Sequence, residues 1–376
     1  MVCVISSLKM GGAERIFAFM ANGLAARGYP VTVLTRKSDN GDFFPLAPTV
    51  RRVCSASPAR QSLRGTIALR FAALLNQRNL RRILLGFKPD CVISFTDHIN
   101  ARVLHALRGT PIPIIISERN NPLTKPVHVP WNIVRRVRYR FAKSLVTPSE
   151  DLMGFFAWVR GPEKIVIPNP VARPVVTDAA ASLPLQSGKR HIIAMGRLAH
   201  QKGFDILLDA FAEIRQHVAD VDLIILGDGP DRQLLEQRVA KLGLHDSVQL
   251  VGAVKNPADW LSHARVFVLS SRFEGFPNAL LEAMSLGIAV VSTDCPTGPR
   301  EIVQHEQNGL LVPVEDPDAL AKAAIRLLSD ETLRSALATS AVRVVERFVP
   351  ERVLDAWEEL IGQTVSSHND GIAERG

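Results

Sequence analysis

Short apolar, β-branched runs alternate along this chain with segments whose apolar residues recur at helical spacing, and this alternation constrains the fold more than any other feature. Such a run is typical of a strand that is buried on both faces of a parallel sheet, and the segment after it is typical of a crossover helix. In the first half of the chain the pattern predicts strands near residues 2–6, 31–35, 90–95, 112–117 and 144–148. The sequence therefore predicts an α/β protein built on doubly wound parallel sheets.

The same pattern returns in the second half, and a chain of 376 residues is too long for one core, so two domains are expected. An amphipathic helix should close the chain, because Pro350 interrupts the preceding helical pattern and apolar residues then recur at helical spacing. The last residues are polar and are expected to be disordered. The predicted organisation is an N-terminal domain over 1–168, a linker over 169–188, a C-terminal domain over 189–348, a helix over 349–365 and a tail over 366–376.

Two carboxylates, Glu274 and Glu282, flank the point where a predicted buried strand runs into a helix. Glu274 falls on the loop and Glu282 about one turn inside the helix, whose first turn accommodates Pro277. Ligands of open α/β sheets bind at the carboxyl ends of strands, and a helix N-terminus at that edge attracts phosphate. A carboxylate one turn inside the helix can accept hydrogen bonds from a ribose diol. Two unrelated glutamates on a solvated helix face would give the same spacing.

Arg197 and Lys202 flank a second strand-end loop in the same half of the chain. Two cations beside helix N-termini suit a diphosphate, and each charged hydrogen bond there contributes about 1.5–3 kcal/mol. Each pattern is weak alone, but their order and spacing together predict a nucleotide-diphosphate site.

Taken together, these motifs resemble the retaining glycosyltransferases of family four. The residues that carry the resemblance are Gly196-Arg197-Leu198, Gln201-Lys202-Gly203, Leu226-Gly227-Asp228-Gly229, Val251-Gly252, Glu274-Gly275-Phe276-Pro277, Glu282-Ala283 and the N-terminal Ser7-Leu8-Lys9-Met10-Gly11-Gly12-Ala13-Glu14-Arg15. The resemblance implies the GT-B architecture, in which two Rossmann-like domains face each other and a C-terminal helix crosses back to the first domain. Val92–Phe95 and Ile114–Asn120 are similar to a bacterial subgroup that builds lipid-linked oligosaccharides and surface polysaccharides.

The resemblance implies a retaining transfer of a hexose or N-acetylhexosamine from a nucleoside-diphosphate sugar, expected to be a UDP-sugar, to a hydroxyl of a lipid-linked glycan, without a metal or another cofactor. Carried over residue by residue, the catalytic set is Glu274, Arg197 and Lys202. The donor-binding set is Gly11, Gly12, Gly196, Arg197, Lys202, Gly252, Glu274, Gly275, Phe276, Asn278 and Glu282, in which Glu282 holds the ribose and backbone amides near Phe276 hold sugar and phosphate.

The residues expected near the acceptor match the family less closely than the donor-binding residues do. Many family members carry a histidine on a first-domain loop near the donor sugar, whereas this chain has arginine in the segment Ser117–Asn120. The candidates for the acceptor site are Asp97, His98, Glu118 and Arg119, together with Arg78, Arg81 and Arg82 of a basic helix that the subgroup uses to hold the acceptor's diphosphate.

Charge is divided unevenly along the chain. Residues 1–170 carry 25 Lys and Arg against 9 Asp and Glu, a net charge of +16, while the remainder has a net charge of −8. Two predicted basic, amphipathic helices, over 60–86 and 131–143, concentrate this charge, although either segment taken alone could equally be a helix with a solvated basic face. Nucleic acid is disfavoured as a partner because no recognition motif and few aromatic residues accompany the charge. The first domain is therefore expected to meet an anionic membrane surface and a polyprenyl-diphosphate-linked acceptor.

The chain shows no run of ~18 uncharged apolar residues and no signal-peptide pattern, and its four cysteines have no paired or metal-like spacing. We expect a cytoplasmic protein that associates peripherally with the inner face of the membrane.

Two other classes of protein share parts of this sequence pattern. A nucleotide-sugar epimerase of the same architecture would not need the basic half, and a non-catalytic sugar-nucleotide binder would not need the charged pocket residues.

Overall fold

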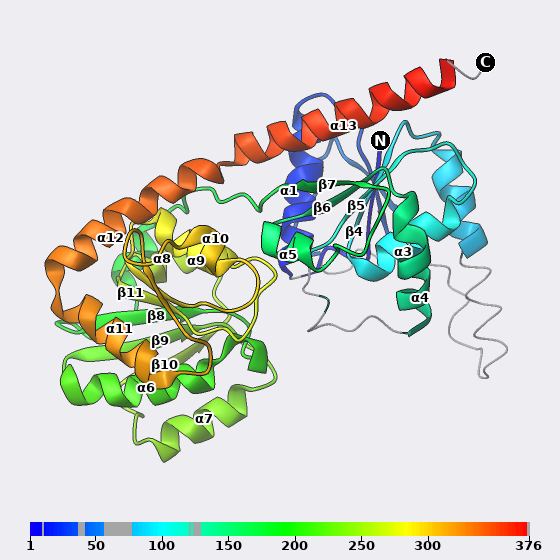
Figure 1. Ribbon diagram of the computed structural model, residues 1–376. Helices are drawn as coiled ribbons and strands as arrows, with labels where there is room; N and C mark the ends of the chain where they lie inside the picture. The colour runs from blue at the N-terminus through cyan, green and yellow to red at the C-terminus, as the bar shows by residue number, and fades with distance from the viewer. Residues whose placement is uncertain (10, 37–41, 56–76, 120–121, 123–128, 374–376) are drawn as a thin grey trace. The chain divides into compact units, whose positions relative to one another are not determined.

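The computed structural model describes residues 1–9, 11–36, 42–55, 77–119, 122 and 129–373 (Figure 1). The chain divides into two compact units: unit 1 contains Met1–Asn169 and Glu351–Gly376, and unit 2 contains Pro170–Pro350. Each unit is built on a sheet of parallel strands with helices on both faces, so the doubly wound α/β fold predicted from the alternation is confirmed.

Within the described residues, the strands of unit 1 form one seven-stranded sheet, and all of its pairings are parallel. In spatial order the strands are β3 (Arg51–Cys54), β2 (Thr32–Thr35), β1 (Val2–Ile5), β4 (Val92–Phe95), β5 (Ile114–Ser117), β6 (Ser144–Thr147) and β7 (Glu163–Val166). The five central strands coincide with the predicted ones. The two edge strands, β3 and β7, were not predicted from the sequence.

Alternate residues of the central strands enter two separate cores. Val2 and Val4 face the core that contains the helical residues 77–86 and α3 (Asp97–Ala106). Cys3 and Ile5 face the core that contains α1 (Gly12–Ala26) and the C-terminal helix α13 (Pro350–Ala373). The remaining helices of unit 1 are α4 (Val129–Arg138), η2 (Tyr139–Phe141) and α5 (Glu150–Gly154).

Helix α13 is an integral part of unit 1, although it comes last in the sequence. Its Trp357 is fully buried and stacks on Phe95 of β4, with ring centroids 5.8 Å apart. Arg27, just after α1, pairs with Asp355 and Glu358 at 2.7 and 2.6 Å. The predicted end of this helix, residue 365, is too early, because the structure continues the helix to Ala373. The expected disorder is therefore wrong for residues 366–373.

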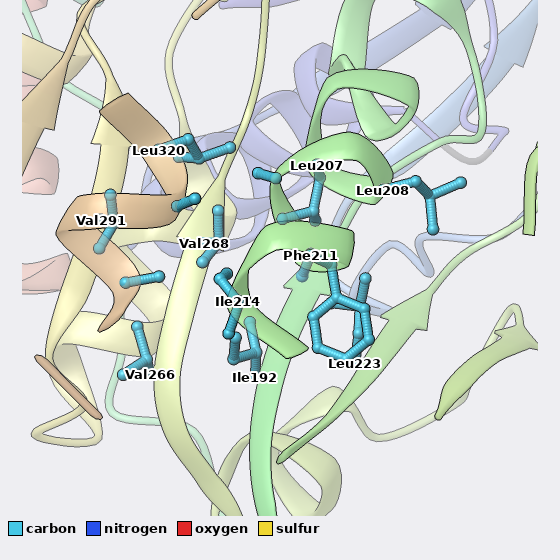
Figure 2. Packing of buried hydrophobic residues seen from close by; sticks show 14 of the residues in the cluster. Ile192, Leu207, Leu208, Phe211, Ile214, Leu223, Val266, Val268, Val291 and Leu320 are labelled. Carbon is cyan, nitrogen blue, oxygen red and sulfur yellow. The ribbon is translucent and has the colours of Figure 1, made fainter. Parts of the chain in front are cut away.

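Unit 2 has a six-stranded parallel sheet within the described residues. In spatial order its strands are β10 (Val248–Gly252), β9 (Val221–Leu226), β8 (Arg190–Met195), β11 (Ala264–Leu269), β12 (Val290–Thr293) and β13 (Leu310–Val312). One face packs on α6 (Phe204–His217) and α11 (Pro317–Ser329), where Phe211 and Leu320 meet the strand residues Leu223 and Val291 (Figure 2). The opposite face packs on α9 (Asn278–Ser285) and α12 (Glu331–Val344). The shorter elements are η3 (Asp178–Ser182), η4 (His200–Lys202), α7 (Arg232–Lys241), α8 (Pro257–Leu261), α10 (Pro299–Ile302) and η5 (Val345–Arg347).

The segment 169–188, which the sequence treats as a linker, has ordered contacts with unit 2. The Thr177 amide and hydroxyl donate to the Asp259 carboxylate at 2.7 and 2.9 Å, and the Ala180 carbonyl lies 3.0 Å from His263 Nε2. From Pro170 onward the segment is grouped with unit 2. The segment from Pro170 is therefore an ordered part of unit 2 and not a flexible linker.

Candidate functional site

The predicted donor residues of unit 2 lie at one edge of its sheet, at the carboxyl ends of neighbouring strands. Gly196 follows β8, Gly252 ends β10, and Glu274 lies between β11 and α9. The strand order reverses between β8 and β11, and ligands of open α/β sheets bind at such a switch point. The loops after β8 and β11 carry Lys202 and Glu274.

Backbone contacts hold these two loops together. The Arg272 amide donates to the Gln201 carbonyl at 2.8 Å, and Gln201 Nε2 donates to the Phe273 carbonyl at 3.0 Å. Gly203 has φ +60°, and a Cβ at this position would overlap the Ser270 carbonyl oxygen, so the close approach requires glycine. Ser270 Oγ in turn donates to the Lys202 carbonyl at 2.9 Å.

Lys202 and Glu274, both predicted to be catalytic, form an ion pair. Lys202 Nζ lies 2.6 Å from Glu274 Oε1, and Ser271 Oγ donates to the same oxygen at 2.6 Å. Glu274 is only 3% exposed, and its carbonyl accepts a hydrogen bond from Thr297 Oγ1. The side chain of Arg197, the third predicted catalytic residue, is exposed on the same loop as Lys202. The structure therefore places a buried carboxylate and an ammonium in contact at one switch point, with Arg197 on the same loop as Lys202.

Helix α9 begins beside this pair. Glu282 is its fifth residue and is 8% exposed, as expected for a carboxylate about one turn inside the helix. The amide of Asn278 donates to the Phe276 carbonyl at 3.0 Å, so the proposed contact between this amide and the donor is already occupied. Within the described residues, no carbonyl accepts from the amides of Gly275 or Phe276, which remain candidates to bind sugar or phosphate.

Arg272 organises the site, a role that sequence analysis did not assign. Its guanidinium donates to both carboxylate oxygens of Asp205 at 2.8 and 2.7 Å, to the His200 carbonyl at 2.8 Å, and to Glu315. Burial alone would raise the pKa of Asp205, but the hydrogen bonds from Arg272 lower this pKa below its ordinary value. Arg272 thus fixes the loop that carries Lys202. Its position directly before the Glu274 loop was the only sequence signal.

Glycines also keep the neighbouring strand ends compact. Gly227, after β9, has φ +134° and donates its amide to the Gly252 carbonyl at 2.8 Å. A Cβ on Gly227 would overlap the Gly196 carbonyl oxygen. Any side chain at Gly227 would therefore push apart the ends of β8 and β9.

In unit 1, Gly11 and Gly12 stand at the N-terminus of α1, where the sequence predicts a close approach to the donor diphosphate. Glu14, in the first turn of α1, folds over Gly11, so that a Cβ on Gly11 would overlap its carboxylate. An anion could approach this helix end only if Glu14 changed rotamer.

Glu118 lies in a buried polar cluster at the carboxyl end of β5. It is 1% exposed, accepts a hydrogen bond from the Tyr139 hydroxyl, and accepts another from Asn100 Nδ2 at 3.3 Å. Asn100 Oδ1 accepts in turn from Ser94 Oγ at 2.8 Å. Neither Tyr139 nor Asn100 was predicted, since they are far from Glu118 in the sequence. Burial, reinforced by the negative charge of Asp97, raises the pKa of Glu118 to about 7.

Asp97 and His98 interact with each other at the start of α3. His98 Nδ1 lies 3.0 Å from Asp97 Oδ1, and the His98 amide donates to the same oxygen. Burial would raise the pKa of Asp97, but the hydrogen bonds from His98 lower it below its ordinary value. Thr96, just before them, has φ +73°, which is strained for a β-branched residue. Because strained backbone is found preferentially at functional sites, Asp97 and His98 remain candidates for the acceptor site.

Arg119 differs from its predicted role. It is 7% exposed, and its guanidinium donates to Ser117 Oγ at 2.8 Å, to the Ile167 carbonyl at 3.1 Å and to Asn169 Oδ1 at 3.0 Å. The guanidinium carbon also lies 5.3 and 5.7 Å from the ring centroids of Phe95 and Trp357. Burial lowers the pKa of Arg119 to about 9. These contacts are structural, and they argue against a direct role of Arg119 in acceptor binding.

The predicted basic helix over 60–86 is described only from residue 77, so its first part, including residues 60–76, lies outside the described residues. Leu80 and Leu84 face the core of unit 1. Arg81 donates to the carbonyls of Ala106 and Arg108 at 2.7 and 3.0 Å, which makes it a partner of the C-terminus of α3. Arg78 and Arg82 are exposed and remain candidates for the acceptor site.

The raised pKa of Glu118 predicts a pH dependence of stability. The native state holds this proton more tightly than the unfolded chain does, so the contribution is complete below the ordinary pKa and is lost as the pH rises through about 7. Between about pH 5 and about pH 8, the parent should lose on the order of 2 kcal/mol of unfolding free energy relative to Glu118→Gln, whose amide does not titrate. Urea unfolding at both pH values measures this difference. As a control, Glu163→Gln, at an exposed position on the edge strand β7, should show the same pH dependence of stability as the parent. If the parent and Glu118→Gln showed identical pH dependence, the raised pKa of Glu118 would be contradicted.

Two family models match the chain: "Glycosyl transferase 4-like domain" over residues 11–170 and "Glycosyl transferases group 1" over residues 189–330. A relative from Campylobacter jejuni, N-acetylgalactosamine-N,N'-diacetylbacillosaminyl-diphospho-undecaprenol 4-alpha-N-acetylgalactosaminyltransferase, is 32% identical over 374 residues, which cover 95% of this chain and 98% of the relative. The lipopolysaccharide core biosynthesis glycosyltransferase LpsD of Rhizobium meliloti is 27% identical, and the match covers 95% of this chain and 96% of LpsD.

Two solved structures share the fold. Sucrose-phosphate synthase from Thermosynechococcus elongatus aligns with a TM-score of 0.82 at 21% identity, covering 97% of this chain and 99% of that structure. Anabaena HepE in complex with UDP aligns with a TM-score of 0.80 at 19% identity, covering 96% and 99%.

Proposed function

This chain belongs to the family of group 1 glycosyltransferases, and we propose that it moves a hexose or N-acetylhexosamine from a UDP-sugar to a hydroxyl of a lipid-linked glycan with retention of configuration. The observation that carries the proposal is the Lys202–Glu274 ion pair at the switch point of unit 2, with Arg197 on the loop that carries Lys202 and Glu282 in the helix that follows Glu274. The Campylobacter relative is named for transfer to a diphospho-undecaprenol acceptor, which supports the lipid-linked class. The solved complex of HepE with UDP makes UDP-sugars the first donors to test.

In the proposed mechanism, Lys202 and Arg197 neutralise the diphosphate as it leaves. The bond between the sugar C1 and the phosphate oxygen breaks, the acceptor oxygen attacks C1 from the same face, and the acceptor proton passes to the leaving phosphate. Preorganised cations stabilise such developing charge because they need no reorganisation during the reaction. The N-terminus of α9 and the amides of Gly275 and Phe276 add to this stabilisation, and Glu282 binds the ribose hydroxyls.

The membrane part of the proposal rests on a surface of unit 1 that we call the α4 surface. It consists of the exposed apolar residues Ile133, Val137 and Phe141, at one-turn spacing, and the exposed cations Arg136, Arg140 and Lys143. Apolar side chains that are 47–59% exposed, with exposed cations in the same segment, suit the interface of an anionic bilayer. None of the described helices is long and apolar enough to cross a bilayer.

Incubating the protein with a panel of nucleotide sugars, with and without a polyprenyl-diphosphate glycan, tests the proposed function. Acceptor-dependent release of nucleoside diphosphate would support the proposed function, provided that the new glycosidic bond keeps the anomeric configuration of the donor sugar. Conversion of the donor to an isomer without release of nucleotide would instead identify an epimerase, and binding without turnover would identify a non-catalytic binder.

We propose that the transfer needs no metal ion, because cationic side chains and helix ends serve the diphosphate. Turnover in the presence of EDTA should therefore equal turnover with added Mg²⁺, as measured by release of nucleoside diphosphate. A strict requirement for Mg²⁺ or Mn²⁺ would contradict this part of the proposal.

A further inference from the structure

We propose that Thr297 is a positioning residue that orients the Gly275 amide toward an oxygen atom of the donor, either a sugar hydroxyl or an oxygen of the phosphate that carries the sugar; this inference rests on the proposed function. Thr297 lies on the loop between β12 and α10. Strands β11 and β12 are parallel neighbours, so the loops that follow them lie at the same edge of the sheet. Thr297 is 1% exposed, so it can act on the donor only through the neighbouring loop that carries Glu274.

Hydrogen bonds join these two loops at several points. Thr297 Oγ1 donates to the Glu274 carbonyl, and the Glu274 amide donates to the Pro296 carbonyl at 3.3 Å. Thr293, at the end of β12, donates from Oγ1 to the Ser271 carbonyl at 2.6 Å, and Ser271 Oγ donates to the Glu274 carboxylate at 2.6 Å. The amide, the carbonyl and the carboxylate of Glu274 are therefore all held within the protein, which fixes the course of its loop.

The backbone at Thr297 is held in an unfavourable conformation. Its φ of +66° lies in the left-handed region, which a β-branched residue rarely adopts. Such a conformation persists only where the surrounding contacts enforce it, and these positions cluster at ligand sites. The next residue, Gly298, has φ +103°, and a Cβ there would lie 2.6 Å from Pro277 Cδ. The strained turn thus passes close to the Glu274 loop and brings the Thr297 hydroxyl to the Glu274 carbonyl.

The bond to this carbonyl determines where the next amide points. The Glu274 carbonyl and the Gly275 N–H belong to one planar trans peptide, in which the two groups point in opposite directions. Because the carbonyl points to Thr297, the Gly275 N–H points away from the β12 loop. A carbonyl that accepts a hydrogen bond also makes the N–H of the same peptide a stronger donor. The Thr297 hydroxyl therefore both orients and strengthens the amide that is proposed to bind the donor.

Calorimetry with UMP, UDP and a UDP-sugar tests this role, because the three ligands differ by one phosphate and one sugar. Thr297→Val removes the hydroxyl but keeps the β-branched shape, so comparison with the parent isolates the hydrogen bond. This variant should bind the UDP-sugar about tenfold more weakly than the parent, the effect of one hydrogen bond, and should bind UMP equally well. Thr297→Ser keeps the hydroxyl and should bind all three ligands like the parent. As a matched control, Thr147→Val removes an equally buried hydroxyl, bonded to the Ser149 carbonyl at 2.9 Å in unit 1, and should also bind like the parent.

The affinity for UDP identifies the oxygen atom. A loss that is already present for UDP assigns the Gly275 amide to a phosphate oxygen, and a loss confined to the UDP-sugar assigns it to a sugar hydroxyl. Thermal melting shows whether each variant is folded, and Thr297→Ala, which also removes the hydroxyl, should show the same loss if the valine variant does not fold.

Unchanged affinities for all three ligands in a folded variant without the hydroxyl would overturn the proposal. An equal loss for all three, UMP included, would also overturn it, since the nucleotide site as a whole would then be distorted. A parent that bound UDP-sugars without transferring sugar would refute the proposed function alone, because the affinities would still test the role of Thr297.

Discussion

Replacing Lys202 with alanine should lower kcat/KM for the nucleotide sugar by about two to three orders of magnitude. In the proposed mechanism the Lys202 ammonium faces the charge that develops on the leaving diphosphate, and loss of one preorganised donor of this kind costs about 2.7–4 kcal/mol. Glu282→Ala should act mainly on the KM for the donor, because this carboxylate is proposed to bind the ribose and not the reacting atoms. Initial rates of nucleotide release across donor concentrations separate the two effects.

The ion pair with Glu274 complicates the single variant. Lys202→Ala leaves a carboxylate that is 3% exposed without its cation, and breaking a buried pair in this way is destabilising. The double variant Lys202→Ala/Glu274→Gln removes the unpaired charge, so it should regain stability while its activity stays low. Lys189, beside the buried Asp222 at the opposite end of β8, provides a matched control, and Lys189→Ala should turn over like the parent. Activity that recovered together with stability in the double variant would show that Lys202 is only structural.

Serine at Ile133, Val137 and Phe141 together should weaken binding to phospholipid vesicles by about two orders of magnitude. Each of these half-exposed side chains contributes about 1 kcal/mol when it becomes buried among lipids, so the loss should be similar for neutral and anionic vesicles. Glutamine at Arg136, Arg140 and Lys143 should produce a loss of similar size for anionic vesicles only, because each cation near an anionic surface contributes about 1 kcal/mol. Added salt should reproduce the second loss and not the first.

Cosedimentation with the two kinds of vesicle measures these effects. A matched control replaces three exposed apolar residues of unit 2, Val175, Leu234 and Val342, with serine. This control should bind vesicles like the parent. If all three triple variants bound equally well, the α4 surface would be an ordinary solvated face, and the membrane would have to be contacted elsewhere.

The fold could be predicted where strands are buried on both faces. The central strands of unit 1 are largely apolar runs, such as Ile114–Ser117, and these runs were recognised. The edge strands β3 and β7 were missed because they contain charged residues, Arg51 and Arg52 in one and Glu163 and Lys164 in the other. Only one side of an edge strand is paired, so its sequence need not be apolar.

The candidate site shows the same division between local and distant information. The residue types at the strand ends could be read from the sequence, and the parallel topology then brings those ends to one edge. The partners could not be predicted, because Tyr139 reaches Glu118 and Arg272 reaches Asp205 only through tertiary packing. Likewise, the sequence suggested Arg81 and Arg119 as acceptor-site candidates, because it could not show that carbonyl groups bind both of them and that Arg119 also lies over an aromatic ring.

The packing of α13 determines the order in which this protein can fold as it leaves the ribosome. Trp357 closes the core beside Phe95, and Arg27 pairs with a residue 331 positions later in the chain. Unit 2, in contrast, is one uninterrupted stretch of chain. The first domain, although translated earlier, is therefore expected to keep part of one apolar face uncovered until α13 has been made. Domains generally fold from the N-terminus onward during synthesis, and here we expect a single C-terminal helix to delay completion of the first domain.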